Sequence, residues 1–253
     1  MLPAVNVILS FIFLISVKID ASFITTDYLQ NAYLISGNSS LVKMDSAGNI
    51  LFTYNQNLYG SLRSVDATDP LKIILTYPDY GTIVMVDNTL SELSVMRLRQ
   101  IGILNFNVAC VASRDNSVWV FDEQDYKLKK IDRNNAISLE SSDMFSLIGK
   151  AVHPSYMRER DQYVYITDPD IGILIFDNYG IYKETLPFKN ITKFQVRNDQ
   201  VLFRVQNALH TYQVTTIMEQ KITLPDSIDI MDISIERNRL YLLKKDELKL
   251  FKF

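Results

Sequence analysis

The aspartates are the residues of this sequence whose spacing first suggests chemistry. Asp45, Asp87, Asp132 and Asp177 recur at a near-constant interval, each at the end of an alternating apolar stretch. Several carboxylates gathered around one point could hold a divalent cation. Each of the four, however, is followed by a turn sequence, and an Asp side chain commonly accepts hydrogen bonds from the backbone N–H groups of such a turn. We therefore predict that they cap turns.

Local clusters of acidic residues are a second place where calcium could bind. Calcium takes six to eight oxygen ligands, usually from an ordered loop with alternating acids and a fixed glycine. None of the clusters here has that pattern, so we predict solvated turns. The clusters are Asp66 with Asp69, Asp122 with Glu123 and Asp125, and Asp168 with Asp170.

The histidines and the cysteine do not form a catalytic or zinc-binding set. His153 and His210 lie far apart, and Cys110 sits within an apolar run. Zinc needs several closely spaced ligands, and a nucleophile needs a paired base and an orienting carboxylate. No glycine-rich phosphate loop occurs either. The sequence predicts no catalytic residue, no metal and no cofactor; it favours a non-catalytic protein and leaves the enzyme question open.

Composition places the chain among ordered globular proteins. The 253 residues are 47% hydrophobic and 22% charged, which is unlike a disordered chain. The net charge of -3, from 26 basic and 29 acidic residues, gives no reason to expect nucleic-acid binding. Cys110 is the single cysteine, so no internal disulfide can form. We expect Cys110 and Trp119 to pack in the interior.

The N-terminal segment has the features of an export signal. Residues 7–17 form an apolar run of the length found in signal peptides, and Ala21-Ser22 offers small residues for cleavage. The run is short for a membrane span, which needs about twenty apolar residues. We expect residues 1–21 to be a signal peptide. The mature protein, residues 22–253, is expected to be periplasmic or secreted in a bacterium, without a permanent membrane span. A retained anchor is the alternative.

Internal repetition is the strongest structural signal. Six hairpins recur, each with an apolar run, a short polar turn and a second alternating run. Most hairpins have a further strand before them, such as residues 63–67, and another behind them, such as residues 50–54. The first runs span residues 33–35, 73–77, 118–121, 163–166, 201–203 and 240–243. The second runs span residues 41–45, 83–87, 128–132, 174–177, 209–213 and 248–251.

Four antiparallel strands per repeat, in six repeats, predict an all-β protein folded as a six-bladed β-propeller. A solenoid or two sandwiches would be the alternatives. The last repeat ends at Phe253 after its third strand, and an open apolar edge invites aggregation. Residues 22–25 form a spare strand near the other end of the chain. We predict that this N-terminal strand pairs with residues 248–253 and closes the last blade.

The hairpins SVWVFDEQDYKLKKID and YVYITDPDIGILIFDNYG resemble the repeats of NHL- and YVTN-type bacterial β-propellers, and the likeness covers the whole mature chain. The resemblance implies a fold, because such propellers serve as binding proteins, scaffolds and enzymes. Those that resemble gluconolactonases or lyases hold a metal with acidic and amide side chains of inner strands. A metal-dependent propeller hydrolase or lyase is therefore the alternative function. The corresponding but incomplete set here is Asp66, Asn107, Gln195 and Asp232.

The longest connection joins the third and fourth hairpins, and its side chains are typical of contact surfaces. Aromatic, Met and Arg residues are enriched in interfaces, and long loops on a rigid scaffold often carry function. We expect Phe145, Tyr156, Met157, Arg158 and Arg160 to form a partner-binding face. The favoured function is an exported, monomeric, non-catalytic propeller that binds or scaffolds another envelope or secreted protein. Recognition of a glycan or peptide by aromatic residues is a third hypothesis.

Overall fold

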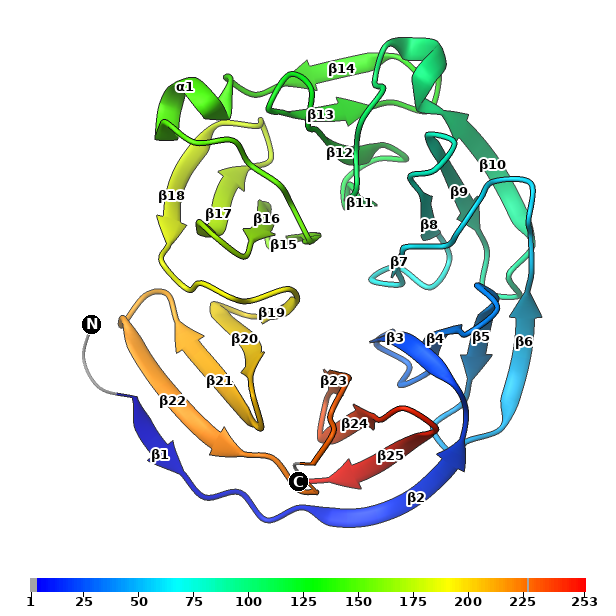
Figure 1. The fold of residues 1–253 in the computed structure, drawn as a ribbon, viewed down its shortest axis with the longest axis vertical. Coiled ribbons are helices and arrows are strands. Elements are labelled where there is room, and N and C mark those ends of the chain that lie inside the picture. Colours follow the sequence, from blue (N-terminus) through cyan, green and yellow to red (C-terminus); the bar gives the residue numbers. More distant parts are fainter. Residues whose placement is uncertain (1–3, 227) are drawn as a thin grey trace. The chain divides into compact units, whose positions relative to one another are not determined.

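The computed structural model describes residues 4–226 and 228–253, which form six sheets. The chain divides into two compact units, residues 56–193 and residues 1–55 with 194–253, and each contains three sheets. The fold is the predicted six-bladed β-propeller with four antiparallel strands in each blade (Figure 1). This confirms the resemblance to the NHL and YVTN propellers at the level of the fold. The helices of the described residues are η1 (Leu98–Ile101) and α1 (Met144–Ile148).

Residues 56–193 hold the second, third and fourth blades, each a meander in chain order. We call the first strand of a blade its inner strand, because the first strands of neighbouring blades contact one another, and the fourth its outer strand. The second blade is β7 (Ser64–Asp66), β8 (Ile73–Tyr77), β9 (Thr82–Val86) and β10 (Glu92–Arg97). The third is β11 (Ala109–Val111), β12 (Val118–Asp122), β13 (Lys127–Ile131) and β14 (Ile137–Glu140). The fourth is β15 (Tyr156–Arg160), β16 (Tyr163–Asp168), β17 (Gly172–Asp177) and β18 (Tyr182–Leu186).

The other unit holds the first, fifth and sixth blades, and it takes two strands from the N-terminal segment. These are β1 (Val5–Val7), parallel to β22, and β2 (Ile12–Lys18), antiparallel to β25 (Figure 1). The first blade is β3 (Ala21–Thr26), β4 (Ala32–Ser36), β5 (Leu41–Met44) and β6 (Ile50–Tyr54). The fifth is β19 (Phe194–Arg197), β20 (Gln200–Val205), β21 (Ala208–Gln213) and β22 (Met218–Thr223). The sixth is β23 (Asp232–Glu236), β24 (Arg239–Leu243) and β25 (Glu247–Lys252), with β2 as outer strand.

Apolar layers between neighbouring blades form the core. Alternation along a strand places successive side chains on opposite faces, so a sheet presents an apolar face to a neighbouring sheet of its own unit. Between the third and fourth blades this layer contains Cys110, Trp119 and Phe121 from one blade and Leu174 and Phe176 from the other, all fully buried. The prediction that Cys110 and Trp119 pack in the interior is confirmed.

The four recurring aspartates cap turns, as predicted. In each case Oδ1 accepts hydrogen bonds of 2.8–2.9 Å from the backbone N–H groups two and four residues later. The residue three positions after each aspartate has a positive φ, and it is Gly48, Leu90, Asn135 or Gly180. Hydrogen bonds from the Asn49 side chain and from turn N–H groups hold the pKa of Asp45 below its usual range. Oδ1 of each of these carboxylates is therefore engaged by the backbone of the turn that follows it.

The N-terminal segment closes the last blade, but the strand that does so differs from the one predicted. Residues 22–25 lie in β3, the inner strand of the first blade, and pair with β4. The strand beside β25 is β2, which comes from the segment predicted to be a signal peptide. The β5–β6 turn packs on it, because a Cβ at Gly48 would lie 2.8 Å from Cγ2 of Val17. Cleavage after Ala21 stays a prediction, and it would remove both β1 and β2.

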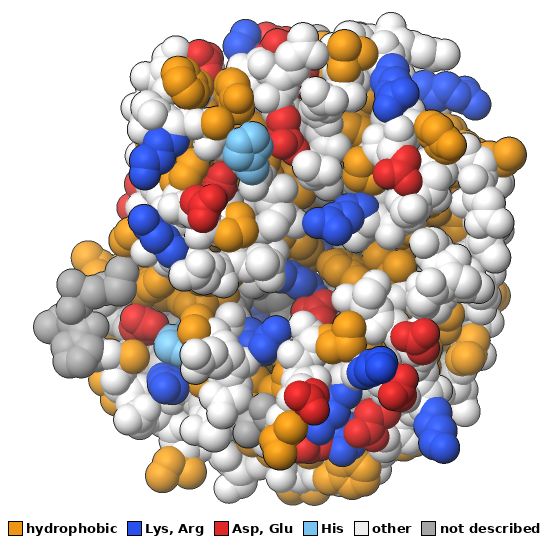
Figure 2. Space-filling view, viewed as in Figure 1, with side chains coloured by type: hydrophobic (Ala, Val, Ile, Leu, Met, Phe, Trp, Pro, Cys, Tyr) orange, Lys and Arg blue, Asp and Glu red, His pale blue; other side chains and the backbone are white. Residues whose placement is uncertain are grey.

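The surface gives no sign of one dominant charge. Figure 2 shows basic and acidic side chains intermixed over the visible face, in keeping with the small net charge. Among the described residues, no helix has the length and hydropathy to cross a membrane.

A chain that begins at Ser22 is expected to lose about 3 kcal/mol or more of unfolding free energy. It would lack Ile15, Val17 and Ile19, which pack partly buried on the core of the first and sixth blades, and it would open the edge of β25. Urea denaturation of this chain and of the full chain measures the loss. Ile8→Ser is the control, since Ile8 is 96% exposed. Equal midpoints for the two chains would show that β2 contributes nothing.

Candidate functional site

Hydrogen bonds from side chains join neighbouring inner strands. Each inner strand is the edge of its sheet, so part of its backbone N–H groups must find acceptors outside the blade. In three places the acceptor is a side chain on the inner strand of the next blade, which ties the two blades together. The pairs are Asp66 Oδ2 with Val111 N–H at 2.9 Å, Asp232 Oδ2 with Ile24 N–H at 3.0 Å, and Gln195 Oε1 with Ile235 N–H at 2.7 Å.

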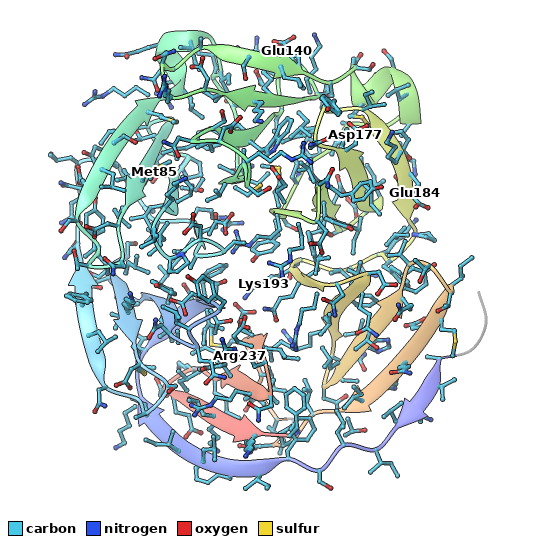
Figure 3. All side chains as sticks on the ribbon, turned by 180° about the vertical axis from the view of Figure 1, so that it is seen from behind. Met85, Glu140, Asp177, Glu184, Lys193 and Arg237 are labelled. Atoms are coloured by element: carbon cyan, nitrogen blue, oxygen red, sulfur yellow. The ribbon has the colours of Figure 1, made fainter. Side chains whose placement is uncertain are left out.

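A buried ion pair links the fourth blade to the second. Arg158 Nη1 on β15 lies 3.2 Å from Asp66 Oδ1 on β7, and Arg158 Nη2 donates to the Val65 carbonyl at 2.6 Å. The guanidinium also stacks 4.7 Å from the ring centre of Tyr156, with Lys193 Nζ 6.0 Å from the same ring (Lys193 is labelled in Figure 3). Burial lowers the pKa of Arg158 and the Asp66 charge raises it, with a net upward shift. Arg158 therefore stays charged.

A second buried carboxylate, Glu159, joins the third and fourth blades. It accepts hydrogen bonds from Trp119 Nε1 at 2.6 Å and from the backbone N–H and hydroxyl of Ser113. Cys110 lies in this region, where burial raises the pKa of its thiol and the Asp66 carboxylate acts in the same direction. A thiol held neutral is a poor nucleophile. These residues therefore have structural roles.

The metal-ligand set that the family resemblance implied does not fit a divalent cation. Asp66, Gln195 and Asp232 each accept a backbone N–H of a neighbouring inner strand, and Asp66 also carries the charge of Arg158. The fourth residue, Asn107, donates its amide to Glu123 at 2.6 Å. In Asp66, Gln195 and Asp232, side-chain oxygens that a cation would need are thus engaged by donors of the protein itself.

The prediction that the acid clusters are solvated turns is only partly correct, because one acid of each cluster is buried, namely Asp66, Asp122 and Asp168. Asp122 and Asp125 share Lys129, whose Nζ lies 2.8 and 2.5 Å from their carboxylates. Asp168 accepts the backbone N–H groups of His153 and Asp170. Within residues 4–226 and 228–253, no group of three His, Cys, Asp or Glu side chains is arranged to hold a metal.

The five residues predicted to form a partner-binding face are not together on one surface. Tyr156, Met157 and Arg158 lie on the inner strand β15, with exposed fractions of only 4%, 1% and 8%. Phe145 is half exposed on α1, and Arg160 is exposed at the end of β15. The C-terminal part of the segment that was expected to be a loop is β15, which pairs with β16 as the first strand of the fourth blade. Only Phe145 and Arg160 remain available for contact.

The structure brings together one polar group that sequence spacing did not reveal. The carboxylate of Glu123 accepts from Asn107 and lies 3.2 Å from Nδ1 of His153. A histidine beside a carboxylate could act as an oriented base. In the described hydrogen bonds, however, no Ser or Cys reaches this imidazole. The three residues come from separate connections of the third and fourth blades, so their spacing carried no signal.

A groove of about 340 Å3 runs between the outer strand of the second blade and two turns of the third. Met85 and Met96 belong to the apolar layer between these blades, and the groove reaches them (Met85 is labelled in Figure 3). One wall is residues 93–96 of β10, and the other is Asn116, Arg133 and Asn135. Leu71 and Lys72, from the β7–β8 connection, close one end. This size suits one or two side chains of a ligand.

Comparisons with known proteins identify the fold. No protein-family model and no curated protein matches the sequence. A virginiamycin B lyase from Staphylococcus aureus has a TM-score of 0.71 at 10% identity, over 96% of this chain and 100% of the other. BamB from Moraxella catarrhalis has a TM-score of 0.54 at 11% identity, over 97% and 98%. A chain of a mitotic checkpoint complex has a TM-score of 0.68 at 10% identity, over 96% and 92%. At such low identities the likeness shows a shared propeller fold, and it says nothing about activity.

Replacing Arg158 by Met is expected to lower the unfolding free energy by about 3–5 kcal/mol, because it leaves the buried Asp66 without its counter-charge. Lys127→Met is the matched control, since Lys127 forms a partly exposed pair with Glu140 and should cost about 1 kcal/mol or less. Adding Asp66→Asn to Arg158→Met should recover part of the loss, which chemical denaturation measures. If Arg158→Met and Lys127→Met lower the unfolding free energy equally, the ion pair does not have this role.

Proposed function

We propose that this chain is a non-catalytic propeller that works as a protein-binding or scaffold module of the bacterial cell envelope. The buried acidic and basic residues of the inner strands support this proposal, because Asp66, Arg158 and Glu159 are hydrogen-bonded or ion-paired to neighbouring blades. The similar fold of BamB and of a chain in a mitotic checkpoint complex is compatible with it. The metal-dependent hydrolase or lyase remains the rival, but its ligand positions have other partners.

The observation that carries the proposal is the groove beside β10. It exposes an apolar floor on the side of a blade and adjoins a strand edge that no other described strand covers. Leu71 and Leu93 stand at its rim with exposed fractions of 60% and 54%. Exposed apolar residues beside a cavity are typical of contact surfaces. A polypeptide partner can cover both the side chains and the open strand edge.

A photo-crosslinking residue in place of Leu93 is expected to capture one partner protein in the native host cells. Mass spectrometry identifies that partner, and the purified pair should form a defined complex by sedimentation. The same residue at Phe145 tests the exposed part of the originally predicted face. Tyr179, 65% exposed on another turn of the same unit, is the negative control. If no position captures a partner that binds again when purified, the chain is not a binding module.

Export is the second part of the proposal, and the apolar run at residues 7–17 supports it. Full-length protein is expected in the periplasmic or secreted fraction, whereas a chain that begins at Ser22 should stay in the cytoplasm. Intact mass of the exported protein then decides whether residues 1–21 are removed. A mass that starts at Ser22 means cleavage, and a full-length mass means that β1 and β2 are retained. Cytoplasmic recovery of the full-length chain would contradict export.

A further inference from the structure

We propose that the groove between the second and third blades binds an extended, acidic segment of a partner protein, which adds as a strand to the open edge of β10. This inference rests on the proposed binding function and names the chemistry of the partner. It depends on three properties of the groove, namely its charge, its apolar floor and its strand edge.

The charge of the groove is positive and lacks a counter-ion. Its lining contains Lys72 and Arg133 and no carboxylate. Within the described part of the chain, neither cation forms a salt bridge or side-chain hydrogen bond. Two cations that converge on one hollow attract an anionic group and steer it to the surface.

The acids of the surrounding turns make their direct contacts with groups other than Lys72 and Arg133. Asp69 Oδ1 accepts the backbone N–H of Leu71 at 2.9 Å. Asp132 caps its own turn, and Asp115 lies 2.9 Å from Lys130.

The floor and the edge distinguish a polypeptide from a simple anion. Met85 and Met96 give the hollow an apolar surface, which gains nothing from a phosphate or a nucleic-acid backbone. β10 pairs with β9 on one side and has no strand on the other within the described residues. An added strand satisfies its open backbone groups and can direct alternate side chains into the groove. Acidic and apolar side chains in alternation match the two kinds of lining.

Selection of displayed random nine-residue peptides on the purified full chain tests the proposal. The selected peptides are expected to be rich in Asp and Glu interleaved with apolar residues, and their Asn and Gln counterparts should bind at least tenfold more weakly. Lys72→Gln with Arg133→Gln should cause a loss of similar size. Lys150→Gln with Lys189→Gln is the matched control, because it removes two exposed charges of the same unit outside the groove. Selection of no peptide, or of peptides without acidic residues, would overturn the proposal.

Hydrogen exchange locates the bound peptide. Backbone amides of residues 92–97 should become protected on binding, as expected for strand addition. Protection confined to another blade, or unchanged affinity in the Lys72 and Arg133 variant, would also refute the inference. A ten-nucleotide single-stranded DNA that competes fully for the groove would assign it to phosphate instead. Self-association of the protein that is lost on Leu93→Ser would assign it to a second copy.

The outcomes separate this inference from the proposed function. If crosslinking at Leu93 identifies a partner whose contact segment is not acidic, the binding function stands and the acidic-strand inference fails. If a partner is captured only at Phe145, the module binds through α1 and the inference about β10 also fails. If acidic peptides bind the groove but no cellular protein is captured at any position, the inference about groove chemistry stands and the proposed function fails.

Discussion

The inner strand of every blade has an edge whose backbone groups its own sheet cannot satisfy, and this constraint organises the centre of each unit. A buried N–H without an acceptor costs about 1–3 kcal/mol. Polar side chains on the adjacent inner strand accept these N–H groups, as Asp66, Gln195 and Asp232 show. Because the oxygens of these side chains accept backbone N–H groups, they are not available to bind a metal ion. The same residues that look like metal ligands in the sequence are therefore the joints between blades.

Two adjacent buried residues of the fourth blade, Arg158 and Glu159, show how charge is accommodated in the interior. Arg158 reaches from β15 to Asp66 and to a carbonyl of β7, and Glu159 beside it receives the indole N–H of Trp119. Adjacent positions on one strand thus carry opposite charges to opposite faces, since side chains alternate along a strand. A buried pair of this kind adds little net stability compared with an apolar contact, but losing one member is costly.

The sequence was informative wherever a pattern repeats. The hairpins, the turn aspartates and most first and fourth strands follow from alternation and turn chemistry, so blade number and strand order could be predicted. The N-terminal segment was ambiguous, because an apolar run such as residues 7–17 suits a signal peptide and an outer strand equally well. The expected binding face was ambiguous for a related reason: Tyr156 and Arg158 look like interface residues by type, but they lie buried on an inner strand. The groove could not be predicted, because its lining comes from segments far apart in sequence.

The turn aspartates connect this regular architecture to a possible site of recognition. Asp132 caps its turn through Oδ1, and the next residue in that turn, Arg133, lines the groove. The repeated turns from which the fold was predicted therefore also determine the local charge at the ends of the blades. Two adjacent blades whose turns carry unpaired cations make a basic hollow on a protein of slightly negative net charge. Binding specificity can therefore change through single turn positions, while the apolar layers between blades stay the same.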